Sequence, residues 1–144
     1  MKRLFYTATM IGVLVTVFVN AAQAQTASPQ VVVAKIPFAF TVGKTNLPAG
    51  KYTFTVVNPA SDRKVLQIRS VDGRASAMIL TNSVSGIVVE NAKLVFERYD
   101  DRYYFTQAQM AGESTGFEAL RSRSERKQMV ANGAKKSVIV ISAG

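Results

Sequence analysis

Two short segments contain the letters of known catalytic motifs. The stretch "GKT" at 43–45 ends like a phosphate-binding loop, which needs Gly-x-x-x-x-Gly-Lys-Ser/Thr before a helix because glycine amides wrap the phosphates. Phe38 stands where the first glycine belongs, and Pro48 follows too soon for a helix. Ser124 and Lys127 have the Ser-x-x-Lys spacing of penicillin-recognising enzymes, but the Ser-Asp-Asn and Lys-Thr-Gly elements are missing. Neither segment predicts catalysis.

The sequence contains no histidine and no cysteine. Ser-His and Cys-His nucleophilic pairs are therefore excluded, as are metal sites built on imidazole or thiolate ligands. Asp100 and Asp101 are adjacent carboxylates. Neighbouring side chains in a hairpin turn diverge, so this pair predicts a turn in preference to a glycosidase pair or calcium ligands. The sequence thus predicts no enzyme, no metal centre and no cofactor.

One segment combines side chains that bind ligands in many proteins. Tyr99, Arg102 and Tyr104 lie together within residues 98–104, and aromatic rings beside arginine can stack on sugars or bases. Ordinary cross-strand pairing explains the same residues without a ligand. Both interpretations stay open, and the three residues are our candidate site for a carbohydrate or an anionic polymer.

A hairpin must position this candidate site. The stretch "KLVFERYDDRYYFTQAQ" alternates around Asp100-Asp101, which predicts two antiparallel strands. One face would pair Phe96 with Phe105 and Arg98 with Tyr103. On the other face Tyr99 would meet Arg102 and Glu97 would meet Tyr104, which predicts a cation over a ring and a carboxylate beside a phenol.

The N-terminal half alternates in the same way. The large apolar side chains of one predicted strand are Ile36, Phe38, Phe40 and Val42, and Pro37 places its start at a sheet edge. After a connection shaped by Pro48 and Gly50, Tyr52 begins the next strand. We expect its hydroxyl to bond to the backbone a few residues upstream, a tyrosine corner. The alternative is that Tyr52 is only a core aromatic.

Turn and capping signals mark the remaining elements. Asp72-Gly73 predicts a two-residue type I′ hairpin that sets Ile68 opposite Ala77 and Leu66 opposite Ile79. Residues 82–91 are compatible with a short strand or with a loop that plugs the core. Ser122 and Glu125 form a capping box for a helix that runs to Ala131 and ends at Asn132-Gly133.

The C-terminal run Ser137–Ser142 is rich in β-branched residues and predicts a central strand. Together these elements predict an all-β fold, an antiparallel β-sandwich or small barrel of about seven or eight strands with one short C-terminal helix.

The N-terminus has the pattern of a secretory signal peptide. Two basic residues precede the apolar run Leu4–Val19, and Ala22-Gln23-Ala24 offers the small side chains of a cleavage site. We expect a signal peptide at 1–24, a flexible lead-in at 25–32 and one β-domain at 33–144; an uncleaved membrane anchor is the alternative. Without cysteine, lipoprotein modification is excluded, and no second apolar stretch is long enough to span a membrane. The predicted location is periplasmic or extracellular.

Two of the 18 basic residues lie in this leader, so the rest of the chain carries 16 basic and 9 acidic residues, a net charge of +7. Such a surface favours anionic partners, such as lipid head groups, an envelope polymer, an acidic polysaccharide or nucleic acid. No motif predicts specific nucleic-acid binding. The charges are scattered along the chain and alternate with apolar residues, however, and solvated strand faces are the stronger explanation for them.

The order of four segments, "IPFAFTVGKTNLPAGKYTF", "VLQIRSVDGRASAMIL", "KLVFERYDDRYYFTQ" and "LRSRSERK", resembles a family of small exported proteins common in acidobacteria. The resemblance spans Ile36 to Lys127 and implies export, but it implies no activity and no functional residue. Many members have a glycine-containing turn and a histidine where this chain has Glu97 and Asp100, so it implies no histidine-based site here.

Overall fold

The computed structural model describes residues 30–131 and 137–143. The predicted signal peptide at 1–24, the residues 25–29 and the predicted helix end at Asn132-Gly133 lie outside the described residues. The first strand begins at Val31, so the last two residues of the predicted lead-in belong to the domain, which starts earlier than residue 33.

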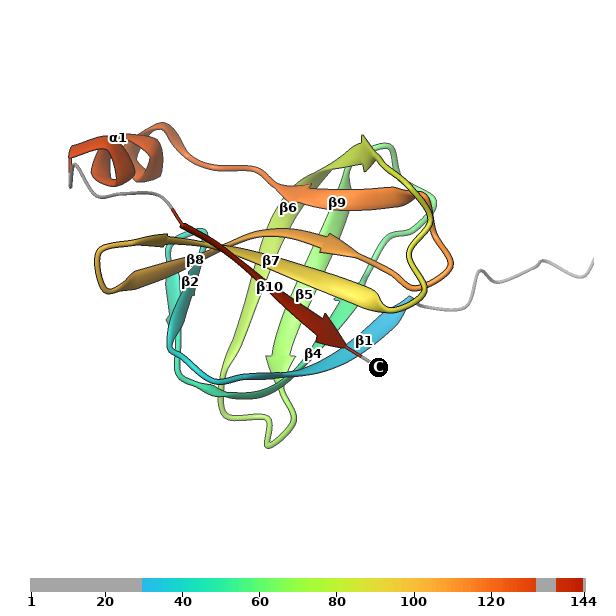
Figure 1. The fold of residues 1–144 in the computed structure, drawn as a ribbon, viewed down its shortest axis with the longest axis horizontal. Helices are drawn as coiled ribbons and strands as arrows, with labels where there is room; N and C mark the ends of the chain where they lie inside the picture. Colours follow the sequence, from blue (N-terminus) through green and yellow to red (C-terminus); the bar gives the residue numbers. More distant parts are fainter. Residues whose placement is uncertain (1–29, 132–136, 144) are drawn as a thin grey trace, which may run out of the picture.

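The described residues form ten strands and one helix (Figure 1). The elements are β1 (Val31–Ile36), β2 (Phe40–Val42), β3 (Thr45–Leu47), β4 (Gly50–Val56), β5 (Lys64–Ser70), β6 (Ser76–Ser85), β7 (Ala92–Tyr99), β8 (Arg102–Gln109), β9 (Thr115–Ala119), α1 (Arg123–Ala131) and β10 (Ser137–Ala143). The prediction of an all-β fold with one short helix is confirmed.

All strands belong to one sheet that curls around a single core (Figure 1). Its main path is β1-β4-β5-β6-β9-β8-β2-β3, while β7 pairs with the other side of β8 and β10 pairs with β7. The strands β1 and β10 are in contact but not paired, so the barrel is not closed. The pair of β2 and β8 is parallel, so the sheet is mixed, whereas the sequence predicted antiparallel strands only.

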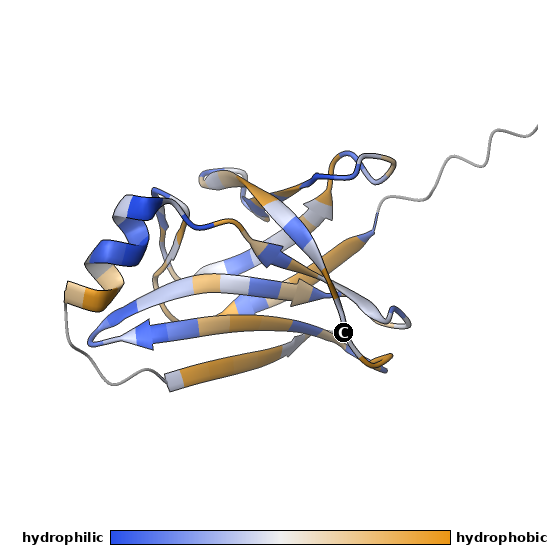
Figure 2. Ribbon diagram, turned by 90° about the horizontal axis from the view of Figure 1, so that it is seen from above, coloured by the Kyte–Doolittle hydropathy of each residue, from blue (hydrophilic) through white to orange (hydrophobic). Residues whose placement is uncertain are grey.

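The core follows from the alternation of apolar and polar residues along the strands, visible as bands of colour in Figure 2. Phe96 is fully buried and contacts the rings of Phe38, Phe40 and Phe105, with centroids 5.2–5.7 Å apart. Burial of each such ring contributes about 2–3 kcal/mol. These aromatic contacts join β2, β7 and β8, the strands that carry the candidate site.

The strand predicted across Pro37 is in fact two strands. The first ends at Ile36 and the next begins at Phe40, because proline has no N–H to continue the ladder. Phe38 lies in the connection, half-buried, and stacks on Tyr103 with the ring centroids 4.0 Å apart.

The hairpin at Asp72-Gly73 has the predicted register, with Ile68 opposite Ala77 and Leu66 opposite Ile79. Its turn differs from type I′, since Gly73 has a φ of 75° but Asp72 has no positive φ. A longer loop results, closed by a hydrogen bond of 2.8 Å from the Ser70 N–H to the Ala75 carbonyl. The Asp72 carboxylate stabilises the loop by accepting from the Ser70 hydroxyl at 2.6 Å and from the Arg74 N–H at 3.1 Å.

Two further predictions are refined by the structure. The segment 82–91 combines the two alternatives. Its first residues belong to β6, which continues to Ser85, and in the loop that follows Val89 is buried against the domain while Ile87 and Val88 are exposed. The prediction that Ser137–Ser142 forms a central strand is wrong. β10 pairs with β7 alone, and Val138 and Val140 are 56% and 53% exposed, because only alternate residues of the run face the core.

Candidate binding cleft

A surface cleft of about 590 Å³ lies between the β2–β3 hairpin, the start of β8 and the start of α1. We call it the hairpin cleft. Its volume is within the range of about 300–1,000 Å³ that is usual for ligand sites. The polar side chains that line it include two basic ones, Lys44 and Arg102, two acidic ones, Asp101 and Glu125, and the neutral Thr41, Asn46, Ser122 and Ser124.

The first wall of the cleft is the tight β2–β3 hairpin. Gly43 has a φ of 59°, so the chain reverses at Gly43 and Lys44 between the paired residues Val42 and Thr45. The "GKT" letters therefore belong to a β-turn. Across this hairpin the Thr41 hydroxyl donates to the Asn46 side-chain oxygen at 2.7 Å.

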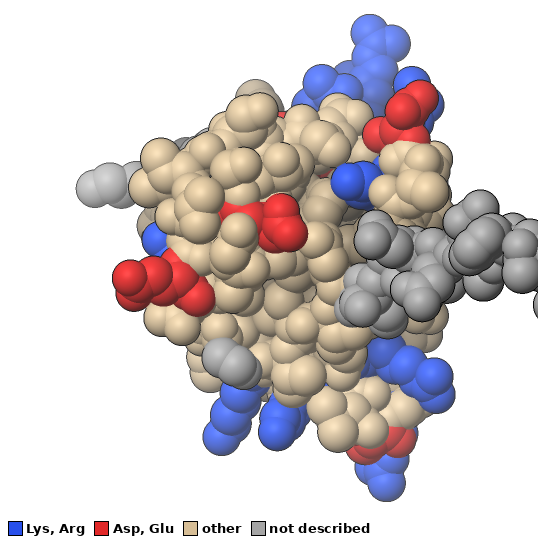
Figure 3. All heavy atoms as spheres, turned by 90° about the vertical axis from the view of Figure 1, so that its right-hand side faces the viewer, with Lys and Arg blue, Asp and Glu red and all other residues tan. Residues whose placement is uncertain are grey.

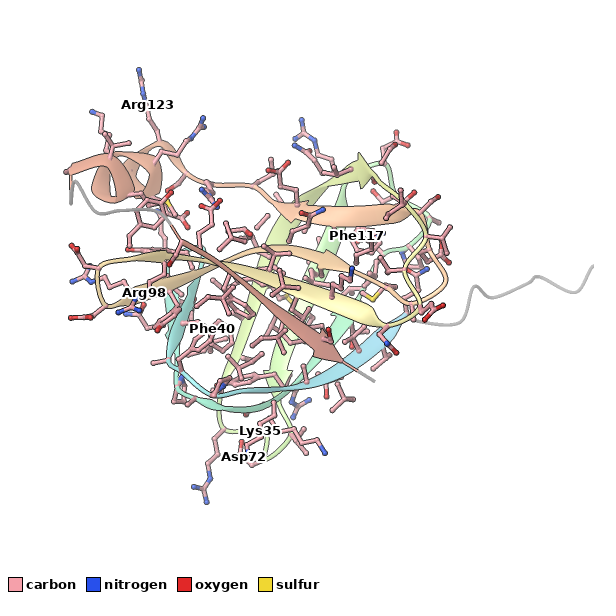
Figure 4. All side chains as sticks on the ribbon, viewed as in Figure 1. Lys35, Phe40, Asp72, Arg98, Phe117 and Arg123 are labelled. Carbon is pink, nitrogen blue, oxygen red and sulfur yellow. The ribbon has the colours of Figure 1, made fainter. Side chains whose placement is uncertain are left out.

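The floor of the cleft comes from the parallel pairing of β2 with β8, in which Phe40 lies opposite Tyr103 and Thr41 opposite Tyr104. Figure 4 shows Phe40 in the interior and Arg98 near the tip of the β7–β8 hairpin. The guanidinium of Arg98 lies over the Tyr103 ring, 5.5 Å from its centroid.

The second wall is the start of α1, which has the predicted capping box. The Glu125 N–H donates to the Ser122 hydroxyl at 3.2 Å, and the Ser122 N–H donates to the Glu125 carboxylate at 3.3 Å. The Glu125 side chain is buried by this arrangement. Its carboxylate serves the helix cap, so it is not placed to act as an acid or base in the cleft.

The three candidate binding residues have different environments. Arg102 is exposed and lines the cleft, and Tyr104 also lines it although only 3% of Tyr104 is accessible. Tyr99 is half-buried and does not line the cleft; it packs edge-to-face on Tyr104, with centroids 5.8 Å apart. The two rings therefore contribute mainly to packing, and Arg102 is the residue of the three that can reach a ligand.

The predicted contacts of the hairpin are partly correct. The register is confirmed, with Phe96 opposite Phe105 and Tyr99 opposite Arg102. The cation–ring contact that forms is Arg98 over Tyr103. The Glu97 carboxylate accepts from the phenol of Tyr99, on its own strand, at 3.2 Å, whereas the prediction placed the phenol of Tyr104 beside it.

A buried ion pair fastens α1 to the hairpin and was not predicted. Arg121 donates to the Glu97 carboxylate at 2.7 Å, and both side chains are largely inaccessible to solvent. Arg121 also approaches the Met129 sulfur at 3.7 Å. Since 24 residues separate Glu97 from Arg121, no spacing rule connects them. Only the tertiary fold, which carries the connection between β9 and α1 past β7, brings the two charges together.

Apart from the turn type at Asp72, most residues predicted to have structural roles are in place. The Tyr52 hydroxyl donates to the Pro48 carbonyl at 2.6 Å, as predicted. Burial, and secondarily the negative charge of Asp72, raise the pKa of Tyr52. The pKa of Asp72 is lowered by its hydrogen bond from Ser70 and then by that from the Arg74 N–H. Gly50, predicted to shape the connection before Tyr52, has no positive φ, and an added Cβ would meet only the Tyr52 ring at 3.5 Å.

Within residues 30–131 and 137–143, no group of three or more acidic side chains is arranged to hold a metal ion. In the same part of the chain, no helix has the length and apolar character needed to cross a bilayer. Comparisons with known protein families, curated proteins and solved structures found no match.

Proposed function

We propose that this protein is an exported, non-enzymatic β-domain of the bacterial cell envelope that binds a carbohydrate or an anionic polymer in the hairpin cleft. Export is inferred from the basic, apolar and small-residue pattern of 1–24. The absence of histidine and cysteine from the sequence removes the commonest side chains of acid–base and nucleophilic catalysis.

The observation that carries the binding role is the supply of hydrogen-bond donors in the cleft. Lys44 and Arg102 are exposed at its surface and carry up to eight N–H donors between them. Of its two carboxylates, Glu125 is engaged by the helix cap, while Asp101 is fully exposed and forms a surface ion pair with Arg98 at 3.5 Å. A donor-rich cleft suits a ligand rich in acceptors, such as sugar hydroxyls, carboxylates or phosphates.

The binding test compares two charge-matched double variants. We expect the protein to be retained on an immobilised acidic polysaccharide at low salt, and Lys44→Gln with Arg102→Gln to lose that retention. Lys35 and Arg63 are also exposed but do not line the cleft, so Lys35→Gln with Arg63→Gln should keep the retention. Failure of the parent protein to bind would favour a purely structural role. An equal loss in both variants would refute the cleft as the site.

Export is tested separately by fractionation of the producing cell. We expect the protein in the periplasm or the medium, with an N-terminus at Gln25 by mass spectrometry. A full-length chain that stays in the cytoplasm would contradict export without bearing on the cleft.

A further inference from the structure

Three basic side chains and one apolar side chain share the solvent face of α1. Arg123, Arg126, Lys127 and Val130 follow the spacing i, i+3, i+4, i+7, which places them along one side of a helix. All four are exposed, Val130 to 80%. We call this face the basic stripe. At 1.5 Å per residue it is about 10 Å long.

The opposite face of α1 holds the helix in place. Met129 and Glu125, four residues apart, are 3% and 7% exposed. Arg121, just before the helix, neutralises the buried Glu97. The single acidic residue of α1 therefore points inward to its cap and does not offset the charges of the stripe. Among the described residues, no ion pair engages Arg123, Arg126 or Lys127.

The stripe projects outward from the barrel. Figure 4 shows Arg123 pointing away from the sheet, on the side opposite the Asp72 hairpin. From the end of the molecule away from α1, most basic side chains lie toward the upper and lower margins, and the middle of the face carries few charges, an acidic side chain among them (Figure 3). The hairpin cleft has walls that can enclose a thin polymer chain. The stripe lies on a protruding helix and has no walls, so it is better suited to contact with a flat surface.

We propose that the basic stripe rests on an anionic lipid surface, with Val130 entering the headgroup region. Lysine and arginine are attracted to anionic headgroups, and an apolar side chain at the same level adds affinity that a hydrated polymer would not supply. This site uses other residues than the hairpin cleft and is independent of the function proposed there.

The test measures partition of the protein, in the form recovered from the cell envelope, into phosphatidylglycerol and phosphatidylcholine vesicles. The measured quantity is the partition coefficient into phosphatidylglycerol vesicles divided by that into phosphatidylcholine vesicles. An apolar leader that is still attached adds similar affinity to both and cancels in this ratio. Each basic residue contributes about fivefold at an anionic surface, so Arg123→Gln, Arg126→Gln and Lys127→Gln together should lower the ratio about a hundredfold. High salt should lower it as well. The matched control is Lys35→Gln, Lys51→Gln and Lys93→Gln, three exposed lysines on β1, β4 and β7.

A second measurement does not depend on the triple variant. The sequence has no tryptophan, so Val130→Trp introduces a single reporter on the stripe. We expect a blue shift of its fluorescence with phosphatidylglycerol vesicles only. The control Val71→Trp, at an exposed position in the loop between β5 and β6, should show no shift. A ratio near one for the parent protein, an equal loss in both triple variants, or retention by soluble polyanions with no blue shift would each overturn the proposal.

Discussion

Replacing Tyr52 with Phe tests the connection between the β3 and β4 strands. The substitution removes one hydroxyl and keeps the ring, which is 1% exposed and packs against Phe40. The lost hydrogen bond to the Pro48 carbonyl is 2.6 Å long. A typical hydrogen bond contributes about 1 kcal/mol net. Because Pro48 itself is exposed, water can reach its carbonyl, so we expect no additional penalty.

The expected result at neutral pH is a loss of about 1 kcal/mol in the free energy of unfolding, measured by urea titration, and a fall in melting temperature of about 4 °C. Tyr103→Phe is the matched control, since its ring is also packed but no hydrogen bond of its hydroxyl is found among the described residues. Equal stability of Tyr52→Phe and the parent protein would refute the reasoning.

The pH dependence of the same pair gives an independent check. The pKa of Tyr52 is raised by folding, so the neutral phenol is favoured in the folded state. Its contribution is present below the unfolded pKa of about 10 and is lost as pH rises through the folded pKa. The difference between parent and Tyr52→Phe should therefore shrink above about pH 10. A difference that grows with pH would mean that the sign of the shift is wrong.

Two further substitutions test local backbone requirements. Gly43→Ala should destabilise the fold by about 1 kcal/mol, because the Gly43 φ of 59° is unfavourable for alanine. Gly50→Ala should change stability by less than about 0.5 kcal/mol. Equal effects of the two substitutions in urea titrations would contradict this distinction. Ser122→Ala should weaken α1 by about 1 kcal/mol and speed amide exchange there, whereas Glu125→Gln keeps a capping acceptor and should not; unchanged exchange in Ser122→Ala would rule out a role for the cap.

Features that depend on neighbours in sequence were predictable. The hairpin register that sets Phe96 opposite Phe105 follows from alternation around one turn. The capping box spans three residues, and the Tyr52–Pro48 bond spans four. In each case the sequence contains both partners and fixes the distance between them.

Features that depend on distant segments were not predictable. The cleft exists because β2 pairs in parallel with β8, and nothing local in Phe40 or Tyr103 encodes that choice. The same pairing brings Lys44 and Asn46 beside Arg102, so only Arg102 of these three was identified as a candidate. The burial of Tyr104 also escaped prediction, because alternation places it on the outer face of the hairpin.

The parallel pairing of β2 with β8 also bears on the order of folding. It joins segments about sixty residues apart, so its contacts must offset a large loop-closure entropy before they form. The hairpins β4–β5–β6 and β7–β8 close much shorter loops and should assemble earlier. The floor of the hairpin cleft would then be completed late, and a ligand held there would select the fully assembled chain over every partly folded form. A ligand bound in the cleft would therefore raise the free energy of unfolding of the whole domain.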